Sequence, residues 1–308
     1  MKYGIFDAHS DTVSKIYETN QSLCENKCHI DFKRMKEYKE YTQIFAAFVD
    51  RKSISVSPKS YVEKLIFKYR KETEKCGISN VLRSADIGKF KYSSILAIEG
   101  GEALEGTLEN LDYFYNLGVR ILTLTWNYDN ELCGGIGDIS GGGLTDFGRA
   151  VVRKMSENGM VVDVSHISEK GFWDVAECCD KPFIASHSNV KKLCSHKRNL
   201  SDEQIREIIR INGVIGINFY PEFLSDTSEC GVEKIIEHIE YILNLGGENN
   251  VGMGSDFDGV DSLPKGMTGI ESVSKLVEIM KKRKYGEELI EKILCGNFMR
   301  VIKENFRQ

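Results

Sequence analysis

Three histidines and a set of carboxylates stand directly after short apolar runs of the chain. The clearest groups are Asp7-Ala8-His9-Ser10-Asp11, Glu99-Gly100-Gly101, Asp163-Val164-Ser165-His166, Ser186-His187-Ser188 and Gly254-Ser255-Asp256-Phe257-Asp258-Gly259. Neutral imidazoles and carboxylates are the ligands that hard-to-borderline divalent metals prefer, and no cysteine joins these groups. The residue types therefore indicate a divalent metal site.

The number and spacing of these residues suit two metal ions. His9 and Asp11, two residues apart on a predicted strand, are expected to project to one side and to bind one ion. His166 and His187 follow neighbouring predicted strands and are expected to bind a second ion, with Glu99 bridging through its two oxygens. Two ions about 3.5–4 Å apart that share a water or hydroxide are a common hydrolytic arrangement.

Each group on its own also has an ordinary structural explanation, such as a hydrogen-bonded histidine or a simple turn. All of these groups follow predicted strands. This shared position favours a functional site, because unrelated structural residues would not all be expected at the same ends of the strands. We expect His29 and His238 to be structural or surface residues, and His196 lies in a basic loop. A Ser-His-Asp triad stays open as an alternative, although no Gly-x-Ser-x-Gly elbow presents a nucleophile.

The elements that must position these groups alternate between strands and helices. Eight nearly continuous apolar runs are typical of strands covered on both faces. They are Gly4–His9, Gln43–Val49, Ser94–Ile98, Arg120–Thr125, Met160–Val164, Phe183–Ser186, Val214–Asn218 and Val251–Ser255. A 3.6-residue period between the runs predicts helices, most clearly over Tyr61–Lys75, Asp146–Asn158, Asp202–Ile211 and Val232–Leu245. Start signals stand at Ser168 and Ser201, and glycine stops at Gly77, Gly159 and Gly246.

Eight βα units without a composition break predict an α/β fold, a closed (β/α)8 TIM barrel, formed by residues 1–308 as a single domain. Enzymes with this fold build their sites at the C-terminal ends of the strands, where the histidines and carboxylates stand. An open doubly wound sheet is the competing fold, but no Gly-x-Gly-x-x-Gly follows the first strand. Gly141-Gly142-Gly143 also lacks the Lys-Ser/Thr of a phosphate-binding loop.

Composition narrows the class of protein and its partners. The longest apolar run, Ile44–Val49, is far shorter than the roughly 20 residues of a membrane helix, and no signal peptide opens the chain. A formal charge of -5 argues against a nucleic-acid partner. Among nine cysteines, only Cys24 and Cys28 have a metal-like spacing, and no second pair follows to complete four ligands; vicinal Cys178-Cys179 is expected to be unbonded. We therefore expect a soluble cytoplasmic protein with reduced thiols and no membrane partner.

Taken in order, the motifs resemble those of the renal (membrane) dipeptidase family, zinc peptidases among the amidohydrolase-type metal barrels. The matching stretches are Phe6–Thr12, Ile98–Gly101, Leu122–Asn127, Asp163–His166, Ser186–Ser188, Arg198-Asn199 and Gly254–Gly259. Most amidohydrolase relatives use His-x-His after the first strand and often a carbamylated lysine as bridge. His-x-Asp together with a bridging Glu99 is similar to the dipeptidase pattern, in a soluble form of bacterial type.

The resemblance implies a binuclear zinc dipeptidase with two Zn²⁺ per chain, although Mn²⁺ or Co²⁺ would suit the same ligands. Its metal ligands would be His9, Asp11, Glu99, His166 and His187. A metal-bridging hydroxide would attack the peptide carbonyl. Asp256 would be catalytic alongside the bridging Glu99. Contacts to the dipeptide would come from Arg198, Trp126, Asn127 and Asp256.

One departure from the mammalian pattern affects the expected substrates. Mammalian members have a histidine where this chain has Trp126, so the way the tetrahedral oxygen is held differs. The expected substrates include dipeptides with a D residue at the C-terminal position, and family members commonly form homodimers. Two alternatives stay open: another amidohydrolase activity on the same barrel, such as a lactonase or deaminase, and a non-catalytic ligand-binding barrel.

Overall fold

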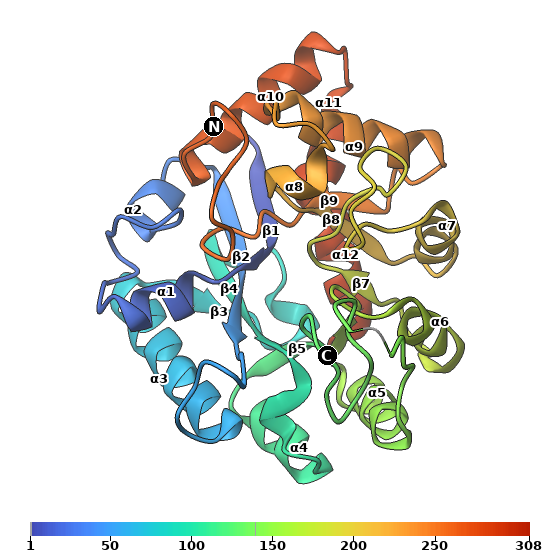
Figure 1. Ribbon diagram of the computed structural model, residues 1–308. Coiled ribbons are helices and arrows are strands. Elements are labelled where there is room, and N and C mark those ends of the chain that lie inside the picture. The colour runs from blue at the N-terminus through green and yellow to red at the C-terminus, as the bar shows by residue number, and fades with distance from the viewer. Residues whose placement is uncertain (1, 139) are drawn as a thin grey trace.

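The computed structural model describes residues 2–138 and 140–308 and shows a closed barrel of strands surrounded by helices (Figure 1). The strands are β1 (Gly4–Ser10), β2 (Glu40–Phe48), β3 (Ser79–Asn80), β4 (Tyr92–Glu99), β5 (Val119–Thr123), β6 (Val161–Asp163), β7 (Ile184–Ala185), β8 (Val214–Ile217) and β9 (Val251–Met253). The sheet order is β2-β1-β9-β8-β7-β6-β5-β4-β3, and an additional β2–β4 pairing closes every strand except β3 into a ring. All of these pairings are parallel. The predicted (β/α)8 barrel is therefore confirmed.

Every predicted strand is present, although several are shorter than their apolar runs. β7 keeps only Ile184–Ala185 of the predicted Phe183–Ser186, because the polar residues that follow bend into the site. β3 was not predicted. It holds two polar residues, pairs with β4 through Ser79 and Ser93, and lies outside the ring, so it carries no apolar run to mark it.

Helices follow most of the strands and cover the outside of the barrel (Figure 1). The α-helices are α1 (Thr12–Glu18), α2 (Phe32–Met35), α3 (Pro58–Cys76), α4 (Leu108–Asn116), α5 (Asp146–Asn158), α6 (Glu169–Cys178), α7 (Asp202–Arg210), α8 (Pro221–Leu224), α9 (Glu233–Asn244), α10 (Val273–Lys282), α11 (Glu287–Glu291) and α12 (Asn297–Asn305). Single turns of other helix types are η1 (Ser84–Asp86), η2 (Gly101–Leu104), η3 (Ile270–Ser272) and η4 (Lys292–Gly296).

The helix ends carry the capping signals seen in the sequence. The Ser201 side chain accepts the N–H of Gln204, whose own side chain accepts the N–H of Ser201, and this reciprocal pair starts α7. Ser168 caps α6 by a single bond, its side chain accepting the N–H of Gly171. Gly77 ends α3 in the left-handed conformation that glycine adopts without a steric cost.

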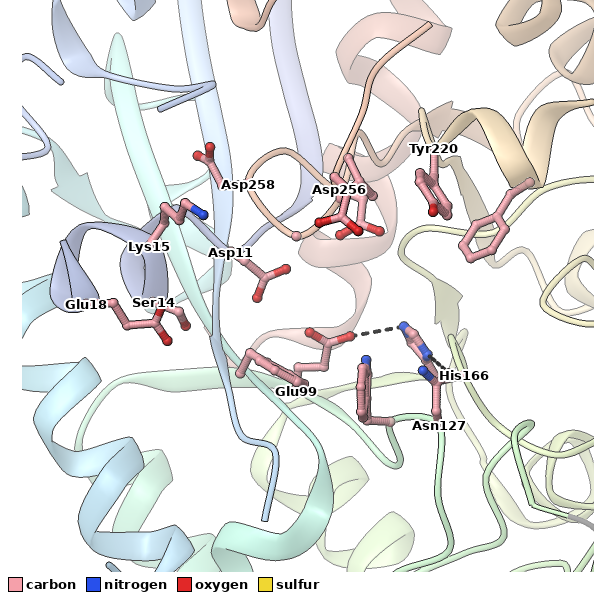
Figure 2. Close-up of a pocket in the computed structure, with 16 residues that line it drawn as sticks. Asp11, Ser14, Lys15, Glu18, Glu99, Asn127, His166, Tyr220, Asp256 and Asp258 are labelled. Carbon is pink, nitrogen blue, oxygen red and sulfur yellow. Dashed lines mark hydrogen bonds and ion pairs between the residues drawn. The ribbon is translucent and has the colours of Figure 1, made fainter. Parts of the chain in front are cut away.

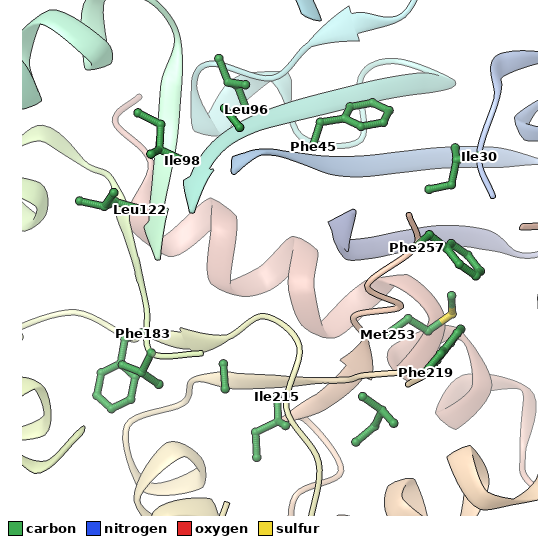
Figure 3. Close-up of a cluster of buried hydrophobic side chains, with 14 of the residues drawn as sticks. Ile30, Phe45, Leu96, Ile98, Leu122, Phe183, Ile215, Phe219, Met253 and Phe257 are labelled. Atoms are coloured by element: carbon green, nitrogen blue, oxygen red, sulfur yellow. The ribbon is translucent and has the colours of Figure 1, made fainter. Parts of the chain in front are cut away.

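Two apolar layers hold the barrel together. One cluster takes Phe6, Ile95, Ile121 and other strand residues from around the ring, so it fills the barrel interior; Phe298 of α12 stacks on Phe6 with ring centroids 5.4 Å apart. The larger cluster lies between the strands and the covering helices. Figure 3 shows side chains of this outer cluster pointing away from the ring; labelled examples from the strands are Phe45, Leu96, Ile98, Leu122, Ile215 and Met253. Apolar side chains therefore fill the barrel interior below the C-terminal ends of the strands.

Two expectations about local structure are wrong. Asp11 is not on a strand: β1 ends at Ser10, and Asp11 is the N-cap residue of α1. The nine cysteines are not all reduced, because a disulfide joins Cys24 to Cys76, 52 residues apart, where the fold brings their Cα atoms within 5.3 Å. Cys178 and Cys179 are free thiols, as expected. None of the helices among the described residues combines the length and apolar character that a bilayer crossing needs.

Candidate metal centre and active site

The Glu99 carboxylate, at the end of β4, lies between two groups of imidazole and carboxylate side chains (Figure 2). Its Oε2 atom is 3.3 Å from His9 Nε2, while its Oε1 atom is 3.2 Å from His166 Nε2 and 3.6 Å from His187 Nε2. Each oxygen therefore faces a different group of ligand atoms, which is the arrangement that a bridging carboxylate needs.

The first group surrounds His9 Nε2. Besides Glu99, Asp11 Oδ2 lies 3.5 Å from this nitrogen and Asp256 Oδ1 lies 3.9 Å from it. His9 Nε2 and Asp11 Oδ1 are buried and have no hydrogen-bond partner. Buried polar atoms normally find a partner, so these atoms fit the ligand shell of a cation. His9 and Asp11 converge as predicted, although Asp11 does so from the start of α1.

The second group is His166 with His187, and its hydrogen bonds fix the two imidazole tautomers. His166 Nδ1 is 3.0 Å from Asn127 Oδ1, an acceptor, so Nδ1 carries the proton. Ser186 Oγ donates to Asp163 at 2.6 Å and lies 2.7 Å from His187 Nδ1, which therefore donates to the hydroxyl. Partners of this kind orient histidines that bind metals.

With both protons on Nδ1, the Nε2 lone pairs of His166 and His187 face each other at 2.8 Å. The Oε1 atom of Glu99 completes a set of three acceptors that share no hydrogen. Acceptors at these distances repel one another unless a cation lies among them. The residues present thus fit a metal ion on this side of Glu99 as well.

Burial and mutual charge shift the pKa values of the cluster. Burial lowers the pKa of His166 and of His187 well below the usual histidine range, which keeps both in the neutral, metal-binding form. Burial alone would lower the pKa of His9, but the carboxylates of Glu99 and Asp11 raise it well above its usual range. Burial raises the pKa of Glu99 to about 7. The negative charge of Glu99 and Asp11 favours a proton on His9, and the same charge would favour a metal cation bound beside His9 Nε2.

A second group of metal-binding residue types lies far from the barrel mouth. Sulfur and oxygen atoms of Cys24, Cys76 and Glu72 lie within 4.8 Å of one another. The two sulfurs are bonded to each other, and Glu72 pairs with Lys68 at 3.1 Å. These atoms are therefore already bonded or paired with one another and with Lys68, and we do not consider the group a metal site.

A pocket of about 480 Å³ opens over the centre, and its walls include three of the four predicted substrate-binding residues, Trp126, Asn127 and Asp256. Trp126 and Asn127 line one side, with Phe48 5.0 Å from the Trp126 ring. Asn127 also holds His166, so it has an orienting contact that sequence reasoning did not anticipate. The rim is formed by Ser14, Lys15 and Glu18 of α1 and by residues 258–261 after β9.

Three residues after β8 were missed from the sequence. Asn218 donates through Nδ2 to Asp256 Oδ2 at 2.8 Å, and Tyr220 and Phe223 line the pocket. The signal was present, because Asn218 ends the predicted strand Val214–Asn218, at the rim where a barrel enzyme places its functional groups.

Arg198 does not line this pocket. Its guanidinium is buried behind His187, donating through Nη2 to the His187 carbonyl at 3.0 Å and through Nη1 to Ser188 Oγ at 3.4 Å, while its Nε has no partner. Burial lowers the pKa of Arg198 to about 10, which leaves the group charged at neutral pH. Arg198 therefore lies directly behind His187 and outside the pocket lining.

Comparison with known proteins shows the family of the chain. The family model described as membrane dipeptidase, peptidase family M19, matches residues 1–307. A dipeptidase of Schizosaccharomyces pombe is 29% identical over 302 residues, covering 90% of this chain and 72% of the yeast protein. A Klebsiella pneumoniae protein encoded in the pqqA 5' region is 34% identical over 241 residues, covering 74% of this chain and 89% of its own length.

Solved structures agree with the fold over the whole chain. A metallopeptidase of Rhodobacter sphaeroides, solved with a phosphinate mimic of the dipeptide L-Ala-D-Ala, has a TM-score of 0.90 at 25% identity, over 99% of this chain and 100% of its own. A dipeptidase of the same peptidase family has a TM-score of 0.90 at 26% identity, over 100% of both chains. The chain belongs to the membrane dipeptidase family, peptidase family M19, and is a metal-dependent hydrolase of peptide bonds.

Proposed function

We propose that this protein is a binuclear zinc dipeptidase that also accepts dipeptides with a D residue at the C-terminal position. The observation that carries the proposal is the position of Glu99 between His9 on one side and the facing Nε2 atoms of His166 and His187 on the other. The ligands would be His9, Asp11 and Glu99 for one ion and Glu99, His166 and His187 for the other. When bound, two such ions would activate a water molecule and polarise the peptide carbonyl.

Asp256 is the proposed proton carrier. Burial raises its pKa, and Asn218 holds its Oδ2 atom, so Oδ1 is the oxygen that remains to accept a proton and pass it to the leaving amine. Asp256 is farther from His9 Nε2 than either Asp11 or Glu99, which supports a role in proton transfer over one in ligation.

Substrate orientation is assigned to Arg198, Trp126 and Asn127. Arg198 would attract the C-terminal carboxylate of the dipeptide, since its planar guanidinium suits a carboxylate better than lysine does. Trp126 would pack against a substrate side chain. The acceptance of a C-terminal D residue is supported by the ligand of the Rhodobacter sphaeroides peptidase, a mimic of L-Ala-D-Ala.

The test is a hydrolysis assay on protein whose metal content has been measured. L-Ala-L-Ala and L-Ala-D-Ala should be cleaved, a tripeptide should not, and about two metal ions per chain should be found. Chelation should abolish turnover, and Zn²⁺, Mn²⁺ and Co²⁺ should be compared for its recovery. Two bound ions without dipeptide cleavage would contradict the proposed substrate, and cleavage without bound metal would contradict the binuclear site.

A further inference from the structure

Residues 19–31, between α1 and α2, form a segment that crosses beside the turn following β9; we call this segment the brace. The disulfide between Cys24 and Cys76 ties it to the end of α3. The carbonyl of His29 accepts the N–H of Ile270 at 3.0 Å, which ties it to η3. Between these anchors the His29 ring packs edge-on against Phe257, with ring centroids 5.6 Å apart.

His29 makes two reciprocal hydrogen bonds with Asp258. The His29 N–H donates to Asp258 Oδ1 at 2.7 Å, and the Asp258 N–H donates to His29 Nδ1 at 2.9 Å. Thr12 Oγ1 donates to the other carboxylate oxygen of Asp258. Because His29 Nδ1 is an acceptor, the proton of the neutral ring is on Nε2. Both the side chain and the backbone of Asp258 are therefore held from outside the pocket.

The turn that His29 holds has an unusual backbone. Asp256 has φ of 60° and Asp258 has φ of 69°, both in the left-handed region that residues other than glycine seldom adopt. Such conformations persist only where the surroundings impose them. Figure 2 shows Asp256 and Asp258 on this turn, with Asp256 directed into the pocket and Asp258 at its rim.

We propose that His29 is a positioning residue for Asp256: by accepting the Asp258 N–H, its Nδ1 atom holds the turn that directs the Asp256 carboxylate toward His9. His29 does not line the pocket, so its effect passes through the turn and not through contact with substrate. The consequence for turnover rests on the proposed function of Asp256, whereas the consequence for the turn does not.

Three substitutions separate the acceptor from the rest of the side chain. In His29→Asn, the amide Oδ1 can occupy the position of Nδ1 and accept the Asp258 N–H. In His29→Gln, the acceptor is displaced toward the position of Nε2, and His29→Leu has none. Tyr38→Phe is the matched control, because Tyr38 donates to the Ile270 carbonyl beside the brace but makes no hydrogen bond to the turn.

The expected result is a kcat lowered about 10–100-fold in His29→Gln and His29→Leu, with KM little changed, because misplacement of a reacting group by about 1 Å has effects of that size. His29→Asn and Tyr38→Phe should keep most of the wild-type kcat. Hydrogen exchange gives a second readout that needs no substrate. The Asp258 N–H should lose its protection in the Gln and Leu variants and retain it in the Asn variant.

Equal kcat and equal Asp258 protection in all three variants would overturn the inference. So would a raised KM at unchanged kcat, which would make His29 a substrate-binding residue. If His29→Leu does not fold, His29→Gln against His29→Asn still decides. A wild-type protein that cleaves no dipeptide would refute the proposed function alone, because the exchange of the Asp258 N–H still tests the hold on the turn.

Discussion

Asp256 differs from its acidic neighbours in how it is held. Glu99 and Asp11 approach His9 Nε2 to 3.3 and 3.5 Å, whereas Asp256 stays at 3.9 Å and has one oxygen bound by Asn218. A carboxylate that is anchored through one oxygen and free at the other suits proton transfer. This difference is the reason for proposing Asp256 as the proton carrier and not as a metal ligand.

This difference predicts separate effects for two isosteric substitutions. Asp256→Asn should leave about two metal ions bound and lower kcat by roughly 10²–10⁴-fold, the range expected for loss of a general acid–base group. Glu99→Gln should instead lose metal, because it removes the shared charge between the two groups of ligands. Metal analysis and steady-state kinetics on both variants are the measurement. Near-normal turnover in Asp256→Asn would remove Asp256 from the chemistry.

At the scale of elements, the sequence predicts what depends on apolar patterning. The strands of the ring appear where β-branched and apolar residues run together, and α5 covers the predicted Asp146–Asn158 without a shift. The strand-end rule then brings Glu99, His166 and His187 together, because parallel strands in a barrel deliver their C-terminal ends to one rim.

What the sequence could not predict depends on contacts between distant segments. The Cys24–Cys76 bond joins a loop to a helix end 52 residues away, and neither spacing nor composition marks that pair. Asp11 was expected on one strand with His9, yet β1 ends at Ser10 and Asp11 is the N-cap residue of α1. The hold of His29 on Asp258 joins residues 229 positions apart. Local patterns carry no information on such pairs.

The disulfide predicts a measurable contribution to stability. Cys24→Ser, Cys76→Ser and the double variant should each lower the free energy of unfolding by about 2–4 kcal/mol, the usual effect of a cross-link that closes a loop of this kind. The losses should not add, since either substitution alone breaks the bond. Denaturant titration without reductant is the measurement, and Cys178→Ser, which removes a free thiol, is the control.

With reductant present, the wild-type protein should match the Cys24→Ser variant. Additive losses in the double variant, or a wild type that reductant does not change, would show that the two thiols are not bonded in solution.

At the scale of the whole molecule, the barrel gathers buried acidic side chains at one place. Asp11, Glu99 and Asp256 are all buried around His9, whose pKa Glu99 and Asp11 raise, so one imidazolium faces three acidic groups. Buried like charges destabilise a fold unless something neutralises them. A bound cation would relieve that repulsion, so metal binding and folding should be coupled.

Removing metal should therefore lower Tm. A ligand present at about a thousand times its Kd stabilises the native state by about 4 kcal/mol, which for a chain of 308 residues corresponds to roughly 6 °C. Thermal unfolding of chelated and Zn²⁺-loaded protein is the measurement. Glu99→Gln should show a much smaller difference between the two conditions. A chelated wild type with an unchanged Tm would contradict the coupling.

The filled barrel interior has a consequence for the order of events in a catalytic cycle. Side chains such as Phe6, Ile95 and Phe298 occupy the space beneath the site, so the pocket is closed toward the barrel interior. We expect both amino acids released from a dipeptide to leave on the side from which the next dipeptide arrives. The amino acid nearer the barrel interior should then leave second, which would make product release sequential and the inner product an inhibitor.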